Sequence, residues 1–514
     1  MSETSFTFDS SQAQLFLNAV THFLQAHPLE SSVALAAASL GGYMLRRMVA
    51  PAYYPNIDGP SSKSVTFGHL FDIFSPESIP FHDELQDKYG SVCKVNGMFG
   101  MLNPVFTAKH MKSLVVVFDA IAQSMKRSMI QDIGSVPGKE IDMLKWCSAT
   151  ALELIGQAEP GLGHKFGVLE GVESPYSIAI KDFLPALTKV LPLQAFFPLF
   201  YNLRPTALQR KLAEWAPLPS IRRIKEIIDV QDKQAQMILE QKKSRLANGQ
   251  ADINDGEESH DIMSVLLKAN MEADEKDRLP EDQLLGQMNT LIFAGHETTS
   301  GALARILQLL AMNPSIQDRL RTELLEAPTQ LTYDDLHNLP YLDAICRETL
   351  RLYPPVSISE REAMADHTVP LRYPIKGKNG EEIREIRVRK GTHIYTALKG
   401  ANRSKETWGQ DADVFRPERW LEKLPESVSE AKTPGVYSSM MTFSAGPKAC
   451  IGFKFSLLEL KTVLSILVKS FRFEPGSTQS VWLYGPTMAP YVKGTKDTPQ
   501  EGNHPTMPLK VSVL

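Results

Sequence analysis

The sequence predicts a mainly α-helical protein with a minor antiparallel β region. Helical periodicity dominates the chain downstream of residue 51, and about thirty residues after Pro280 continue it without a break. Only residues 369–397 carry the alternation that is typical of strands. The chain has 514 residues, of which 43% are hydrophobic and 22% charged, so it is long enough for a large buried core.

The first fifty residues have the pattern of a membrane anchor. Residues 29–45 are apolar and rich in small side chains. Their length is at the low end of the roughly 17 to 25 residues that are needed to span a bilayer. Arg46 and Arg47 follow them and would keep the downstream chain cytosolic. A cleaved signal peptide and a buried helix are the alternatives, but signal peptides carry their charges before the apolar run. We expect residues 1–50 to anchor the chain in membrane lipid and residues 51–514 to form one catalytic domain.

Charge and cysteine content exclude several classes of protein. The formal net charge of -4, without a long block of like charge, argues against a nucleic-acid partner. The 4 cysteines are too scattered for a disulfide scaffold, and no C-x-x-C pair suggests zinc. A reducing compartment fits this usage.

The elements follow in order along the chain. Residues 51–64 contain three prolines and a glycine and form a connector that cannot be helical. Residues 174–191 and 220–249 are expected to be helices, and the next long helix runs from Pro280 to the residue before Pro314. In residues 369–397 the Asn379-Gly380 pair predicts the turn of a hairpin.

The long helix contains a polar cluster within an apolar setting. The cluster consists of His296, Glu297, Thr298, Thr299 and Ser300. Buried polar groups are costly without partners, so the cluster is expected to line a ligand, with Gly295 and Gly301 leaving room for it. The alternative is that the hydroxyls bond back to the preceding turn. The zinc-protease pattern H-E-x-x-H is excluded because Ser300 replaces its second histidine.

A cysteine between two glycine turns forms the second candidate site. Cys450 lies in the stretch TFSAGPKACIGFKF, just before an apolar helical pattern. A cysteinate at a helix N-terminus gains from the helix dipole and from backbone N–H groups, which we expect to lower its pKa. An inert buried thiol is the alternative, and it is the one preferred for the other three cysteines. Upstream, Glu348 and Arg351 are spaced to pair on one face of a helix.

These motifs, in this order, resemble those of the cytochrome P-450 family of haem-thiolate monooxygenases. FSAGPKACIG is similar to the family's haem loop and AGHETTS to its oxygen-activation motif, while ETLR and FRPERW resemble its ion-pair core. The similarity extends from about residue 51 to the C-terminus. The anchor matches the eukaryotic microsomal form of the family, and the sequence resembles those of fungal members. It implies the cytochrome P-450 fold and a haem b cofactor.

The resemblance assigns roles residue by residue. Cys450 would bind the haem iron, Thr298 would hydrogen-bond the iron-bound oxygen and Glu297 would help to deliver protons. Glu348, Arg351 and Arg419 would brace the haem loop as a buried charge network. The remaining cofactor-binding residues implied are Phe443, Gly446, Lys448, Gly452, Arg361, Ala294 and Gly295. Of these, Arg361 would pair with a haem propionate, and Lys448 stands where many members have arginine.

The family pattern is interrupted between Gly100 and Met101. Several dozen residues that the resemblance places there are missing, including part of the first β region and a loop over the substrate. A lost exon or a splice form is one interpretation, and a genuinely shortened protein is the other. The retention of every other motif favours the first.

The resemblance predicts a monooxygenase of the endoplasmic reticulum membrane with its catalytic domain in the cytosol. It would oxidise a lipophilic small molecule, such as a terpenoid-like specialised metabolite, using O2 and electrons from an NADPH-cytochrome reductase. A truncated scaffold that binds haem poorly or not at all is the alternative. A third candidate, a member that rearranges its substrate, is disfavoured by the Glu297-Thr298 pair.

Overall fold

The computed structural model describes residues 108–157, 164–172, 175–197, 200, 203, 206–247, 281–446, 449–492 and 504–514. The expected anchor, the junction of Gly100 with Met101, and Lys448 lie outside these ranges. Within them, no helix combines the length and apolar character needed to cross a bilayer. The predicted anchor therefore stays a prediction.

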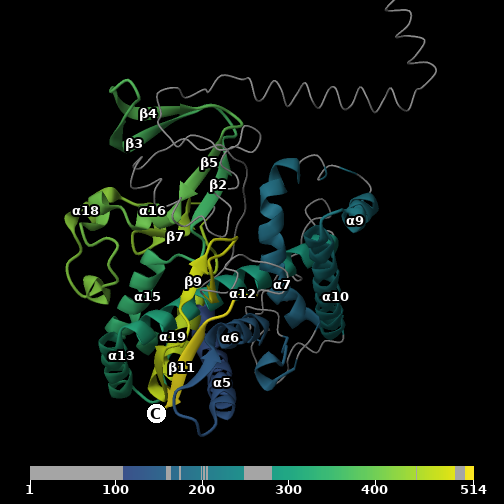
Figure 1. Cartoon of the computed structure of the whole chain (residues 1–514), viewed down its shortest axis with the longest axis vertical. Helices are drawn as coiled ribbons and strands as arrows, with labels where there is room; N and C mark the ends of the chain where they lie inside the picture. Colours follow the sequence, from purple (N-terminus) through teal and green to yellow (C-terminus); the bar gives the residue numbers. More distant parts are fainter. Residues whose placement is uncertain are drawn as a thin grey trace, which may run out of the picture.

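Helices form most of the described structure, as expected (Figure 1). The longer ones are α5 (Ala108–Ile133), α6 (Met143–Gln157), α7 (Pro175–Val190), α9 (Thr206–Trp215), α10 (Pro219–Ala247), α12 (Glu281–Met312), α13 (Pro314–Glu326), α15 (Pro340–Leu352) and α19 (Phe453–Ser470). The short ones are α14 (Tyr333–His337), α16 (Leu398–Asn402), α17 (Lys405–Trp408), α18 (Glu426–Ala431), η1 (Val168–Glu170), η2 (Leu191–Phe196) and η3 (Pro417–Trp420). The helices predicted over residues 174–191 and 220–249 are confirmed as α7 and α10.

The strands form small antiparallel sheets. β3 (His367–Lys376) pairs with β4 (Glu382–Val388) through a turn in which Gly380 has a φ of 82°, so the predicted hairpin is confirmed. β2 (Ile358–Glu362) pairs with β5 (His393–Ala397), β6 (Gly435–Tyr437) with β7 (Met440–Ala445), and β9 (Ser480–Leu483) with β10 (Ala489–Val492). The one three-stranded sheet of the described chain has the order β1 (Lys139–Asp142), β11 (Pro508–Val513), β8 (Phe471–Pro475).

Helix α12 runs through the middle of the molecule (Figure 1). It contacts α13, α15 and α19 on one side and α6 and α10 on the other. Residues 301–311 are buried except for the half-buried Arg305, whereas Ala294, just before the polar cluster, is exposed. The burial that the sequence predicts is therefore confirmed after the cluster but not before it. Pro314 begins α13 directly after it, because proline fits the first turn of a helix but not its interior. A continuous rod thus supports the polar cluster of residues 296–300.

Gly156 of α6 is tightly packed against residues 164 and 166. A Cβ at this position would lie 2.6 Å from the main-chain oxygen of His164 and 2.7 Å from the ring of Phe166. We expect Gly156→Ala to destabilise the fold by about 1–3 kcal/mol, because a backbone oxygen cannot move aside. Gly286→Ala is the control, since Gly286 is an exposed residue of α12 and a Cβ added to it would meet nothing within 4 Å. Thermal unfolding should show this control equal to or more stable than the parent chain, and equal shifts in both variants would contradict the packing argument.

Candidate active site

A fully buried ion-pair network joins α15 to η3. Arg351 donates from Nε to Glu348 Oε2 at 2.9 Å and from Nη2 to Glu348 Oε1 at 2.8 Å, which is bidentate geometry. Arg419 of η3 donates from Nε to Glu348 Oε1 at 3.3 Å. None of the three side chains is more than 1% exposed. The structure therefore brings together the triad that the sequence predicts.

Neighbouring groups satisfy the remaining donors of the network. Arg351 Nη1 donates to the main-chain oxygens of Asn402 and Ala412, at 2.9 and 2.6 Å. Trp420 Nε1 donates to Glu348 Oε2 at 3.0 Å, and Arg419 Nη1 donates to Asp411 Oδ1 at 2.9 Å. The hydrogen bond from Arg419 holds the pKa of Asp411 below its usual value. Such complete pairing is what allows charges to remain in the interior.

The cysteine loop follows β7. Gly446 has a φ of 61°, a left-handed conformation that favours glycine, and an added Cβ there would meet nothing within 4 Å. The N–H of Cys450 donates to the main-chain oxygen of Phe443 at 2.7 Å, and Gly452 caps the start of α19. Cys450 is exposed, whereas Cys147 and Cys346 are completely buried. Among the described cysteines, Cys450 alone is accessible to a ligand.

The expected lowering of the Cys450 pKa is wrong for the protein without a metal. Burial raises the pKa of the thiol, because protein surrounds the sulfur on most sides although the residue reaches the surface. The hydrogen bond from the N–H of Gly452 opposes this shift but is the smaller effect. The positive charge of a bound metal would favour the thiolate form.

The residues around Cys450 fit a haem. Among the described residues, no group of three or more His, Cys, Asp or Glu side chains could hold a metal ion. One thiolate suits an iron whose equatorial ligands come from a porphyrin. A Cβ on Gly446 would meet none of the described atoms within 4 Å. Arg361 of β2 has its Nη2 3.5 Å from Ser444 Oγ at the edge of this loop, where a cation could meet a propionate.

The hydroxyls of the polar cluster are partly bonded within α12. Thr298 Oγ1 donates to the main-chain oxygen of Ala294 at 2.7 Å, and Ser300 Oγ donates to that of Glu297 at 3.2 Å. The alternative of back-bonded hydroxyls is therefore confirmed for these two residues. Ala294 is exposed, but a Cβ on Gly295 would lie 3.0 Å from Ile155 of α6. Helix packing thus accounts for the missing side chain of Gly295, and contact of its backbone with haem stays a prediction.

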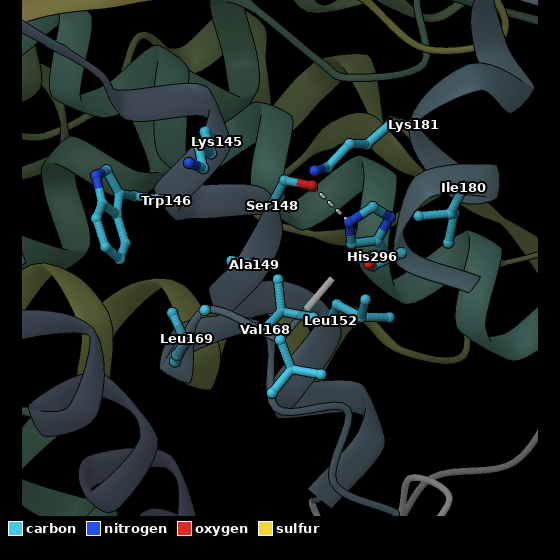
Figure 2. A pocket seen from close by; sticks show the side chains of 13 residues that line it. Lys145, Trp146, Ser148, Ala149, Leu152, Val168, Leu169, Ile180, Lys181 and His296 are labelled. Atoms are coloured by element: carbon cyan, nitrogen blue, oxygen red, sulfur yellow. Dashed lines mark hydrogen bonds between the residues drawn. The ribbon is translucent and has the colours of Figure 1, made fainter. Parts of the chain in front are cut away.

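His296 is held between Glu297 and a serine of α6. Its Nε2 is 2.7 Å from Ser148 Oγ, and its Nδ1 is 3.2 Å from Glu297 Oε1 without making a hydrogen bond. Figure 2 shows Ser148 and His296 on the wall of a cavity of about 190 Å³ that is lined by α6, η1, α7 and α12. The imidazole is only 1% exposed. Burial and, as the smaller effect, the nearby Glu297 carboxylate raise the pKa of Tyr491.

Comparison with known proteins decides the family. A family model described as cytochrome P450 matches residues 98–492. The chain belongs to the cytochrome P450 family. Cytochrome P450 monooxygenase 91 of Postia placenta is 37% identical over 532 residues, covering 91% of this chain and 96% of that protein. Cytochrome P450 monooxygenase 81 of the same organism is 36% identical over 544 residues, covering 95% and 98%. Ganoderic acid synthetase of Ganoderma lucidum is 40% identical over 423 residues, covering 80% and 76%.

Membership confirms the expectations for the fold, the enzyme class and the cofactor. The chain is a fungal P450 whose family uses haem with a cysteine thiolate as the iron ligand. Sequence reasoning missed Ser148 and Asn402, which touch the predicted residues only through the tertiary fold. It also missed Trp420, although this residue directly follows Arg419 in the FRPERW motif.

Proposed function

We propose that this P450 inserts an oxygen atom into a lipophilic small molecule, using O2 and electrons from an NADPH-cytochrome reductase. The observation that carries the proposal is the exposed residue Cys450, which lies just before the N-terminus of α19. A terpenoid-like or other specialised metabolite is the proposed substrate. The name of the Ganoderma lucidum relative, ganoderic acid synthetase, supports a biosynthetic role.

Each of the proposed site residues would have a separate role. Cys450 would hold the haem, which when bound supplies the iron at which O2 is activated. The Thr298 hydroxyl would turn from Ala294 to donate a hydrogen bond into the site. Glu297, whose Oε1 lies 3.2 Å from His296 Nδ1, would pass a proton to that hydroxyl from its carboxyl group. Arg361, Phe443, Gly446, Lys448, Gly452, Ala294 and Gly295 are the proposed cofactor contacts.

We place this activity at the endoplasmic reticulum membrane. The apolar residues 29–45 and the arginines after them support an anchor in membrane lipid with the catalytic domain in the cytosol. Microsomal expression followed by a carbon monoxide difference spectrum of the reduced protein tests the haem site. A strongly red-shifted Soret band is expected, and its absence would favour the scaffold alternative.

One comparison bears on the predicted interruption of the family pattern. The alignment with cytochrome P450 monooxygenase 91 has 532 positions, more than the 514 residues of the chain, of which it uses 91%. It therefore contains positions at which the relative has residues and this chain has none. Such positions agree with a segment missing between Gly100 and Met101. Sequencing the transcript across this junction would distinguish a lost exon from a shortened protein.

Thr298→Ala tests the proposed proton delivery. We expect the variant to keep its haem but to lose coupling, since no hydroxyl would direct protons to the reacting oxygen. The yield of product per NADPH should fall by about 100-fold at most, and peroxide should form instead. Both quantities are measured in the same reaction. Thr290→Ala, which removes another back-bonded hydroxyl of α12, is the control and should remain coupled.

A further inference from the structure

The strand that leads to Cys450 has little support from its own sheet. Strands β6 and β7 pair at Gly435 with Ala445 and at Tyr437 with Met440, with a shift in register between these positions. Residues 441–444 therefore fall between the paired positions. Ser444 has a φ of 59°, which is unusual for a residue with a side chain. A strained backbone of this kind persists only when its surroundings hold it in place.

Asn402, the last residue of α16, supplies hydrogen bonds to this part of β7. Its Oδ1 accepts from the N–H of Met441 at 2.6 Å, and its Nδ2 donates to Thr442 Oγ1 at 2.8 Å. Thr442 Oγ1 in turn donates to the main-chain oxygen of Leu350 in α15, at 2.7 Å. Asn402 is only 1% exposed, so water cannot replace these bonds.

The same residue is joined to the buried ion pairs. The main-chain oxygen of Asn402 accepts from Arg351 Nη1 at 2.9 Å, and Arg351 is paired with Glu348. On the other side, Phe443 follows Thr442 directly, and its main-chain oxygen accepts from the N–H of Cys450 at 2.7 Å. An unbroken path of hydrogen bonds and one strand thus joins the ion pairs to the cysteine.

We infer that Asn402 is a positioning residue, which fixes β7 to the ion-pair network and thereby sets the place of Cys450. Without its side chain, the half-buried Met441 would lose the partner of its N–H, and Thr442 would lose one of its two bonds. The strand could then shift along its interrupted ladder. The effect on the haem spectrum rests on the proposed function, whereas the attachment of the strand does not.

Amide hydrogen exchange of the full-length protein, resolved at single residues, tests the attachment. We expect Asn402→Ala to speed exchange at Met441 and Cys450 by about tenfold, the effect of one lost hydrogen bond. The matched control is Asn289→Ala, which removes an amide that donates to Asp232 Oδ1 at 3.0 Å, far from β7 in the sequence. Unchanged exchange at Met441 in Asn402→Ala, or an equal increase in the control, would overturn the inference.

A conservative variant covers the case in which Asn402→Ala does not fold. Asn402→Asp keeps an acceptor for Met441 but not the donor to Thr442, so Met441 should stay protected while Cys450 exchanges faster. Unchanged exchange at Cys450 in this variant would count against the inference.

A spectrum of the haem-loaded proteins gives a second readout. Both variants should show a smaller share of the thiolate Soret band than Asn289→Ala, and equal shares would argue against positioning of the cysteine. If the parent chain lacks that band, the proposed function fails, and hydrogen exchange still decides the role of Asn402.

Discussion

Replacing Cys450 with alanine should abolish the thiolate Soret band of the reduced, carbon monoxide-treated protein. The side chain is the single accessible thiol among the described cysteines, and no cluster of alternative metal ligands surrounds it in the described part of the chain. Alanine has no donor atom, so the thiolate signal should be lost completely. The protein should remain folded, since Cys450 is exposed and contributes no side chain to the hydrophobic core.

Cys346→Ala is the matched control for this experiment. Cys346 is completely buried in α15, and burial raises the pKa of its thiol to about 12, so it stays protonated. The control should retain the full thiolate band. A band that survives in Cys450→Ala, or one that is lost equally in Cys346→Ala, would remove the assignment of Cys450 as the iron ligand.

Glu348→Gln should have the largest effect on stability. The neutral amide would leave Arg351 and Arg419 with two buried positive charges and no carboxylate between them. Removing one partner of a buried ion pair typically costs about 3–5 kcal/mol, much of a protein's total stability. We expect a large fall in the denaturant concentration at the unfolding midpoint, together with loss of haem during purification.

An exposed ion pair with the same spacing provides the comparison. Glu426 accepts from Lys423 at 3.1 Å, with side chains that are 78% and 84% exposed. Glu426→Gln should leave the unfolding midpoint unchanged within error, because solvent screens such pairs. Equal shifts in Glu348→Gln and Glu426→Gln would show that burial does not decide the importance of the Glu348 network.

Local patterns predicted the parts of the fold that are local in sequence. The run from Pro280 to Pro314 predicted α12, and Asn379-Gly380 predicted the hairpin of β3 and β4. Glu348 and Arg351 are one helical turn apart, so their pairing could also be predicted. Arg419 was identified through family resemblance, since 68 to 71 residues of chain separate it from its partners in the triad.

Contacts made only by the folded chain could not be predicted. Asn402 shows no distinctive pattern in the sequence, and it acquires its role because α16 lies against β7. Gly295 shows the converse, since the space that suggested a ligand is filled by Ile155 from another helix. The pKa of Cys450 depends on how much protein surrounds the sulfur, which the order of residues does not specify.

The position of β11 has a consequence for how the protein is made. This strand follows both β1 and β8 in the sequence, yet it lies between them in the sheet, and Val511 within it is completely buried. Since β1 and β8 come earlier in the sequence, they have no partner between them until β11 has been made. The sheet can therefore close only after all the other described elements have been synthesised, and this pairing over long stretches of chain is a slow step of folding.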